Sequence, residues 1–268
     1  MQNLRLVETA RHVRESVIMN ACRSRCPHVG SVLSCVDALV YLYGEAMRVD
    51  PGDWENRDIF ILSKGHAALA LYAVLADKGI IGKAEFEGYL QNDGTLPGHL
   101  DRFSAKGVEA SAGSLGHGFN IGLGMAYGFK KKGPDRKVFT LIGDGESQEG
   151  SIWEGALFAS KLGIDNFTAI LDYNNLQGYG RPNEICGYEP VADKWRAFGW
   201  ETCEADGHDF SQLRAAVNAP HNGRPKIIIA RTVKGKGVPF MENEMKWHYY
   251  IVTEELKEKA LKSLSGMK

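Results

Sequence analysis

Short apolar runs alternate along the chain with longer segments whose apolar residues recur at helical spacing. Each run is long enough for one strand, and continuous apolar runs are typical of strands that are buried on both faces of a parallel sheet. This rhythm predicts an α/β fold with a mainly parallel sheet. The predicted strands lie at 58–63, 138–142, 167–171, 199–204 and 226–231, and the predicted helices at 6–22, 36–42, 64–79, 152–162, 191–198, 210–218 and 254–264.

The central unit is the strand at 138–142, the helix that follows it and the strand at 167–171. A strand, helix and strand in this order imply a parallel pair joined by a crossover. Both strands then end at the same edge of the sheet, where open α/β sheets bind ligands. Asp144 follows the first strand and Asn174 follows the second, so we expect both side chains at this edge.

A carboxylate and an amide oxygen in this position form part of a site for a hard cation such as Mg²⁺. Gly143 and Gly145 flank Asp144 and leave room for the main chain to approach a diphosphate without an intervening Cβ. A Gly-Asp-Gly segment alone is also typical of a hairpin turn. The flanking strands and the later Asn174 favour the ligand site over the turn.

These residues resemble a known motif. Gly143-Asp144-Gly145 followed by Asn174 resembles the thiamine diphosphate motif, and Gly-Asp-Gly-Glu-Ser-Gln-Glu-Gly-Ser-Ile-Trp-Glu from Gly143 resembles the version found in the transketolase family. The resemblance implies a three-layer α/β/α fold that binds thiamine diphosphate. It also implies a metal ion, Mg²⁺ (or Ca²⁺/Mn²⁺), held by Asp144, Asn174 and the backbone carbonyl of Leu176. Glu149 is then expected beside the diphosphate loop, helping to connect neighbouring cofactor sites.

Four histidines lie in segments that resemble the same family. Ser-Lys-Gly-His66-Ala and Leu-Pro-Gly-His99 match closely, whereas the His28 loop has Pro27 in place of a glycine, and Tyr249-Tyr250 follow His248 in place of small residues. A single loop histidine is often only a polar surface residue. Together, the resemblance implies that His28 and His248 transfer protons and orient the donor. It implies that His66 and His99 bind ketose hydroxyls, and that His66 and His248 also contact the cofactor.

A glycine-rich loop runs into a helix of small residues near position 121. By the resemblance, Gly113, Ser114, Leu115 and Gly116 pack on the thiazole and diphosphate of the cofactor. His117 stands where the family usually has glutamine, which is a departure close to the pyrimidine or the substrate.

Composition narrows the function further. The chain has 32 Lys and Arg against 33 Asp and Glu in 268 residues, so bulk charge gives no affinity for nucleic acid. No apolar run is long enough to span a bilayer, and no secretory signal is visible, so we expect a cytoplasmic protein. Five cysteines without Cys-x-x-Cys pairs are expected to be reduced thiols. His12, His208 and His221 fit no motif and are expected at the surface.

The resemblance covers nearly the whole chain but only the first of three family domains. We therefore expect one domain at 1–268, in which 231–268 form a substrate-side loop and a closing helix. The resemblance implies that a separate chain carries the pyrimidine-side domain with its glutamate, in an α2β2 assembly. The expected activity is transfer of a two-carbon ketol unit from a ketose (phosphate) to an aldose. Alternatives are a specialised enzyme for a sulfo- or amino-sugar, a deoxyxylulose phosphate synthase-like enzyme, and a non-catalytic cofactor-binding subunit.

Overall fold

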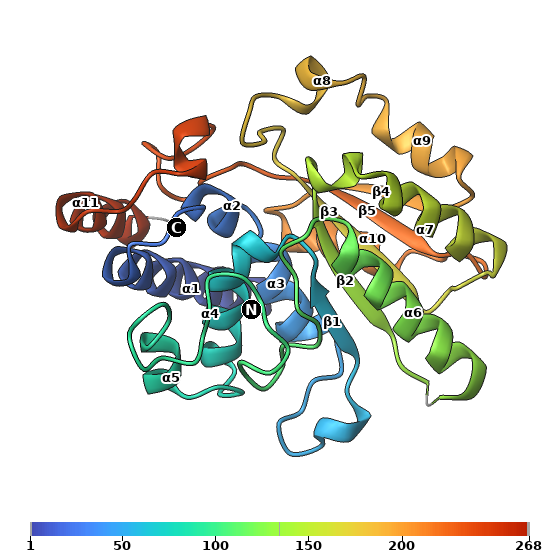
Figure 1. Ribbon diagram of the computed structural model, residues 1–268, viewed down its shortest axis with the longest axis horizontal. Helices are drawn as coiled ribbons and strands as arrows, with labels where there is room; N and C mark the ends of the chain where they lie inside the picture. The colour runs from blue at the N-terminus through green and yellow to red at the C-terminus, as the bar shows by residue number, and fades with distance from the viewer. Residues whose placement is uncertain (1, 134, 267–268) are drawn as a thin grey trace.

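A single parallel sheet forms the centre of the computed structural model, which describes residues 2–133 and 135–266 (Figure 1). The five strands lie in the order β1-β2-β3-β5-β4, and all neighbouring pairs are parallel. The parallel α/β prediction is therefore confirmed, while the predicted domain ends at 1 and 268 lie outside the described residues. The strands are β1 (Ile59–Leu62), β2 (Val138–Gly143), β3 (Phe167–Tyr173), β4 (Glu201–Asp206) and β5 (Lys226–Arg231).

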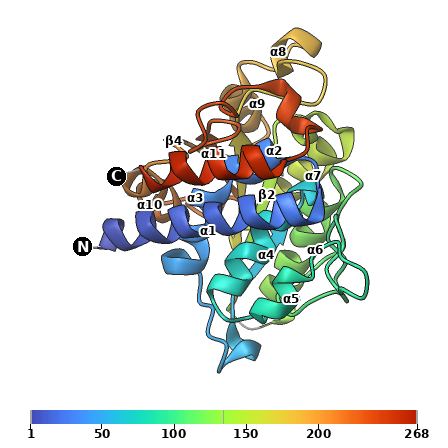
Figure 2. The same cartoon turned by 90° about the vertical axis from the view of Figure 1, so that its left-hand side faces the viewer.

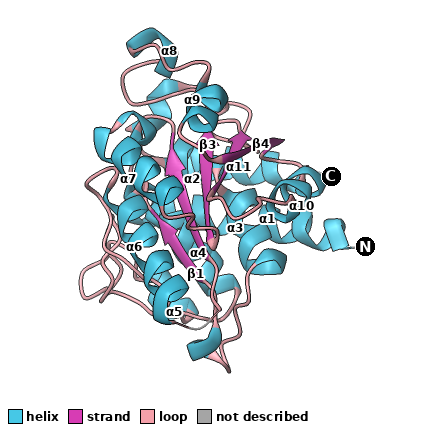
Figure 3. Ribbon diagram, turned by 90° about the vertical axis from the view of Figure 1, so that its right-hand side faces the viewer, coloured by secondary structure: helices cyan, strands magenta, loops and turns pink. Residues whose placement is uncertain are grey.

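Helices cover both faces of this sheet (Figure 3). Successive strand residues face opposite sides, so Phe60 and Leu62 belong to one apolar core and Ile59 and Ile61 belong to the other. This alternation explains why the strands are apolar throughout. One core includes α2 (Val29–Ser34), α3 (Val36–Tyr41), α4 (Ala68–Asp77) and α10 (Phe210–Asn218), and the other includes α6 (His117–Lys132), α7 (Gly150–Lys161) and α9 (Val191–Ala197).

A further helical layer lies outside the first of these faces. Helices α1 (Gln2–Ser24) and α11 (Glu254–Ser265) run side by side across it (Figure 2). The predicted first helix is thus present, but it packs mainly on α3, α4 and α11 rather than on the sheet itself. Because it is covered on several sides, it buries Arg14 and Asn20 as well as its apolar residues.

Short elements build the connections. They include α5 (Lys83–Glu87), α8 (Pro182–Ile185), a π-helical turn at Leu42–Ala46 and 3₁₀ turns at Trp54–Asn56, Gly65–Ala67, Glu146–Gln148 and Met245–His248. Strand β4 begins two residues later than predicted, because Gly199 adopts φ +84° and ends the preceding helix in a turn. All five cysteines are free thiols. Among the described residues, no helix combines the length and the apolar character needed to cross a membrane.

Candidate active site

A cavity of about 450 Å³ opens at the carboxyl edge of the sheet. The pairing of Gly143 with Asp172 aligns the ends of β2 and β3, so the loops that follow them meet there. Among the predicted site residues, Ser114 is exposed and does not line the cavity. Gly116 is buried and does not line it either. The other predicted site residues do: His28, His66, His99, Gly113, Leu115, Gly143, Asp144, Gly145, Glu149, Asn174, Leu176 and His248.

Asp144 carries a buried oxygen that is free to bind a ligand. Its Oδ1 accepts a hydrogen bond of 2.8 Å from the amide of Gly145, whereas Oδ2 has no partner among the described residues. Burial, and then the nearby carboxylate of Asp172, raise the pKa of Asp144 to about 6. A bound cation would satisfy this oxygen and stabilise the charged carboxylate.

Asn174 and Leu176 lie on the loop after β3 and line the same cavity as Asp144. The Oδ1 atom of Asn174 accepts from the amide of Leu176 at 3.1 Å, and its Nδ2 donates to Asp172 at 3.3 Å. Asn175 adopts φ +60°, which turns the chain sharply between them. The carbonyl of Leu176 accepts from Nζ of Lys234 at 2.9 Å, and its second lone pair is available to a ligand.

These oxygens fit a hard divalent cation. Carboxylate, amide and carbonyl oxygens are the ligand types that Mg²⁺ and Ca²⁺ prefer. Among residues 2–133 and 135–266, no group of three or more His, Cys, Asp or Glu side chains is placed to hold a metal. Three protein oxygens fill about half of a six-fold shell, and a bound ligand and water can supply the rest. A Cβ built on Gly143 would make only an ordinary contact of 3.7 Å with the Lys64 side chain, so the packing of the protein does not by itself require glycine at this position.

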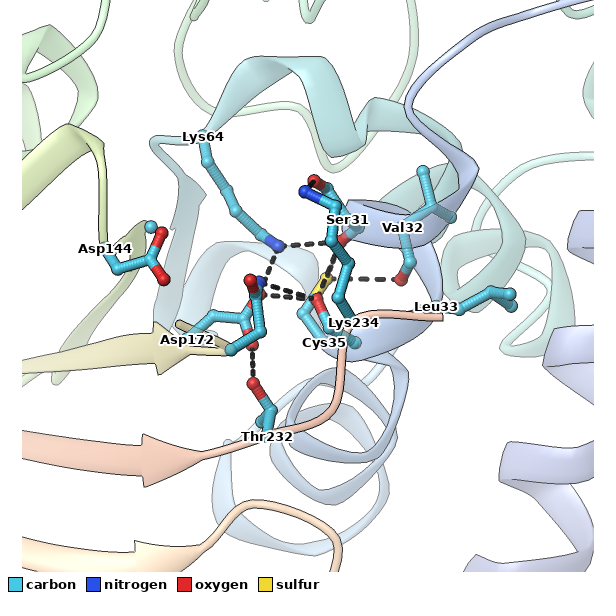
Figure 4. Close-up of polar contacts among 12 residues, drawn as sticks. Ser31, Val32, Leu33, Cys35, Lys64, Asp144, Asp172, Thr232 and Lys234 are labelled. Carbon is cyan, nitrogen blue, oxygen red and sulfur yellow. Dashed lines mark hydrogen bonds and ion pairs between the residues drawn. The ribbon is translucent and has the colours of Figure 1, made fainter. Parts of the chain in front are cut away.

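A buried ion pair that was not identified from the sequence lies beneath this loop. Nζ of Lys64 donates to Oδ2 of Asp172 at 2.5 Å, and both side chains are 1% exposed (Figure 4). Burial alone would raise the pKa of Asp172, but the Lys64 ammonium and the hydroxyls of Ser34 and Thr232 hold it below its usual value. Asp172 is therefore a charged structural anchor, whereas Asp144 stands apart from this network.

Glu146 is a second buried acid that sequence reasoning missed. Its carboxylate accepts from the Ser63 hydroxyl and from the amides of Gly116 and Gly143, the two amides at 2.9 and 3.1 Å. Burial raises the pKa of Glu146, and the hydrogen bonds partly oppose this effect. Glu146 thus ties the glycine-rich loop to the end of β2.

Lys234 is a fourth side chain near the cavity that was not identified from the sequence. It is fully buried, and its Nζ lies 3.1 Å from Nδ1 of His248 and 3.4 Å from the Ser31 hydroxyl. Burial lowers the pKa of Lys234 to about 8, although the Asp144 carboxylate opposes this. A buried ammonium that is paired mainly with neutral groups favours an anionic ligand.

The four predicted histidines form one cluster. The His28 ring lies 5.3 Å from His66, 6.1 Å from His99 and 5.1 Å from His248, measured between centroids. The amide of His28 donates to the carbonyl of His248 at 3.0 Å, which joins two segments far apart in the sequence. His28 adopts φ +71°, a left-handed conformation that is uncommon outside glycine and often found at functional sites.

We expect two of these imidazoles to remain neutral well into the acid range. Burial, and then His99 and Lys234, lower the pKa of His28 to about 4, while burial, and then Lys234 and His28, lower the pKa of His248 to about 3. Since the unfolded chain takes up these protons near pH 6.5, the two groups lower the free energy of unfolding as the pH falls from about 7 to 4. Side-chain NMR titration checks this prediction, and titration of both rings near pH 6.5 would contradict it.

The mouth of the cavity is less buried than its floor. Glu149 is exposed at the start of α7, and Tyr249 is 58% exposed, with its ring packed edge-on against His248 and His28. His117 is exposed and does not line the cavity. The roles predicted for Glu149 and Ser114 stay predictions.

One expectation about the remaining histidines is wrong. His208 was expected at the surface, but its side chain is only 9% exposed and its ring bonds to Asp37 and to the amide of Val233. No local pattern indicates this burial, because the bonded residues lie on α3 and on the loop after β5. His12 has a side chain that is 65% exposed, as expected.

Comparison with known proteins identifies one matching family. A family model described as "Transketolase, thiamine diphosphate binding domain" matches residues 4–268. The 6-deoxy-6-sulfo-D-fructose transketolase subunit of Clostridium sp. (strain MSTE9) is 39% identical, and the match covers 98% of this chain and 97% of that protein. An apulose-4-phosphate transketolase subunit of Actinobacillus succinogenes is 40% identical, with 94% and 92% covered.

Solved structures agree in fold. The transketolase of Leishmania mexicana superposes with a TM-score of 0.89 and 26% identity. The match covers 97% of this chain but 41% of that one. The chain therefore spans less than half of that longer transketolase, but nearly the full length of the two relatives named before it.

Proposed function

Because the chain belongs to the transketolase family, we propose that it is the cofactor-binding subunit of a two-chain transketolase, which transfers a two-carbon ketol unit from a ketose to an aldose. The observation that carries the site assignment is the free Asp144 oxygen at the floor of a cavity that four histidines line. A buried acid oxygen suits a metal-bound anion, and the nearby imidazoles of His28, His66 and His248, whose pKa values burial lowers, suit the hydroxyls of a sugar.

Thiamine diphosphate and Mg²⁺ account for the buried polar groups. Asp144, Asn174 and the Leu176 carbonyl would hold the metal, while Lys234, Ser31 and His248 would face the diphosphate. The further predicted contacts are His66, Gly113, Ser114, Leu115, Gly143, Gly145 and Glu149. When bound, the thiazolium ring supplies the electron sink that a ketol transfer requires.

The histidine cluster would bind the sugar hydroxyls and transfer protons. A neutral imidazole both donates and accepts hydrogen bonds, so it can orient a hydroxyl or move a proton at its oxygen. Burial keeps the pKa of His66 well below its usual value, and the positive charge of Lys64 adds a smaller effect in the same direction, so the ring is neutral at working pH. We propose that His66 and His99 bind hydroxyls, and that His28 and His248 transfer protons.

A second chain would complete each site. The relatives that this chain matches over nearly their whole length are named as parts of transketolases, while the Leishmania mexicana transketolase is more than twice as long. We propose that a separate chain with the pyrimidine-side domain covers the cavity mouth in an α2β2 assembly. The exposed Glu149 and Tyr249 at that mouth suit such a contact.

The substrate is proposed to be a ketose with a terminal anionic group. The names of two relatives specify 6-deoxy-6-sulfofructose and apulose 4-phosphate, which share that chemistry. Tyr249, on the cavity mouth beside His248, is placed to influence the choice between such sugars. A screen of donors that includes both compounds and fructose 6-phosphate would distinguish a specialised enzyme from a general one.

We expect ketol transfer only when the partner chain is present. This chain alone should show no transfer above background, and the co-purified pair should be active with thiamine diphosphate and Mg²⁺. In the pair, His66→Ala should lower kcat/KM roughly 10- to 100-fold through loss of a hydroxyl contact or a proton transfer. The exposed His12→Ala serves as the control.

Three results would contradict this proposal. Full activity of the isolated chain would exclude the need for a partner. An unaffected His66→Ala pair would favour a non-catalytic role for this chain. Release of CO₂ from pyruvate by the pair would favour a deoxyxylulose phosphate synthase-like reaction.

A further inference from the structure

The segment 232–236, which carries Lys234 into the cavity region, is fixed by several hydrogen bonds. The Thr232 hydroxyl donates to Asp172, and the amide of Gly235 donates to the carbonyl of Gly30 at 2.9 Å. The carbonyl of Lys234 accepts from the amide of Asn243, also at 2.9 Å. A loop held in this way can direct a lysine to one place, provided that the backbone next to the lysine is also held.

His208 holds that backbone. Its Nε2 lies 2.8 Å from the amide nitrogen of Val233, the residue before Lys234. A backbone amide can only donate, so Nε2 is the acceptor and carries no proton. The proton of the neutral ring is therefore on Nδ1, which lies 2.6 Å from Oδ2 of Asp37. One tautomer satisfies both contacts.

Asp37 and Arg14 fix His208 in turn. Both oxygens of Asp37 accept from the Arg14 guanidinium, at 2.9 and 2.6 Å, and the Arg14 side chain is 2% exposed. Burial alone would raise the pKa of Asp37, but Arg14 and the His208 ring hold it well below its usual value. Arg14 also donates to the carbonyl of Lys236 at 3.1 Å, so this cluster contacts both sides of the lysine.

We propose that His208 is a positioning residue whose Nε2 fixes the amide of Val233 and so holds the Lys234 ammonium at the carbonyl of Leu176. The proposal rests on the proposed function, because it gives Lys234 the task of pairing with the diphosphate. His208 itself does not line the cavity. It acts only through the backbone and through the Arg14–Asp37 pair behind it.

Two substitutions separate this role from general stability. In His208→Gln the amide oxygen can reach the position of Nε2 and accept from Val233, whereas in His208→Asn the shorter amide reaches only the Nδ1 position and faces Asp37. We expect His208→Asn to expose the amides of 233–235 to faster hydrogen exchange in the full two-chain enzyme. It should raise the apparent KM for thiamine diphosphate roughly tenfold, with kcat retained at saturating cofactor.

In His208→Gln, the exchange rates of these amides and the apparent KM for thiamine diphosphate should both stay within about threefold of the parent values. His12→Asn, which also changes a histidine beside a carboxylate but lies at the surface, should change neither measurement. Equal effects of Asn and Gln at 208, or unchanged exchange and KM in His208→Asn, would overturn the proposal.

Lys234→Met distinguishes the failure of this inference from the failure of the proposed function. If Lys234→Met weakens cofactor binding while His208→Asn does not, the positioning role is wrong and the cofactor assignment stands. If Lys234→Met leaves binding unchanged, Lys234 does not contact the diphosphate and the positioning role fails with it, whereas failure of the cofactor assignment itself would appear as undiminished binding by Asp144→Asn.

Discussion

Replacing Asp144 by asparagine is expected to weaken Mg²⁺-dependent binding of thiamine diphosphate by more than about a hundredfold, beyond what loss of a supporting contact costs at metal sites. The substitution keeps the size of the side chain but removes the negative charge that would face the metal. Isothermal calorimetry on the two-chain enzyme, with and without Mg²⁺, checks this. For the parent enzyme, cofactor affinity should also fall as the pH drops through about 6, because protonation of Asp144 removes the same charge.

The same variant should leave the ligand-free protein folded. Asp144 has a raised pKa, so its charged form is unfavourable in the fold, and neutralising it should not lower the free energy of unfolding at pH 7. Asp193→Asn, at a side chain that is 68% exposed, provides the control for binding. Undiminished binding by Asp144→Asn would remove the basis of the metal site.

Lys64→Met is expected to have the largest effect on stability. It would leave the carboxylate of Asp172 buried without its cation, and loss of one partner of a buried pair costs about 3–5 kcal/mol. Chemical denaturation measures the loss. The double variant Lys64→Met with Asp172→Asn should recover more than half of it, because no charge is then left unpaired.

Lys83→Met is the matched control, since the Lys83 side chain is 88% exposed and its ion pair with Glu87 is weak at 3.9 Å. It should change the free energy of unfolding by less than about 0.5 kcal/mol. A Lys64→Met protein as stable as the control would show that the pair with Asp172 does not hold the loop.

Local patterns in the sequence were sufficient to place the strands and the edge where the ligand loops meet. The order of apolar runs predicted parallel pairing, and Asp144 and Asn174 followed strands that proved to be neighbours. The four histidines converge as their motifs implied. These predictions worked because a strand's end and its following loop are local properties.

The buried charges could not be predicted in the same way. Lys64 follows β1 while its partner Asp172 lies in β3, and Glu146 contacts a segment 30 residues away. His208 meets Asp37 and Val233 only after the chain has folded. Lysine, glutamate and histidine are ordinary surface residues in most contexts, so their residue types do not mark them as interior, although Lys64 and Glu146 stand inside motifs that resemble the family.

The contrast between the buried floor of the cavity and its exposed mouth has a consequence for how new enzymes of this type could arise. The charged groups beneath the cavity, such as Lys64 with Asp172, are paired in the interior, so changing one of them leaves its partner buried without a counter-charge. Tyr249 is more than half exposed, and surface changes away from buried networks cost little. Variation at the mouth could therefore redirect the protein to other sugars while the inherited chemistry below is preserved.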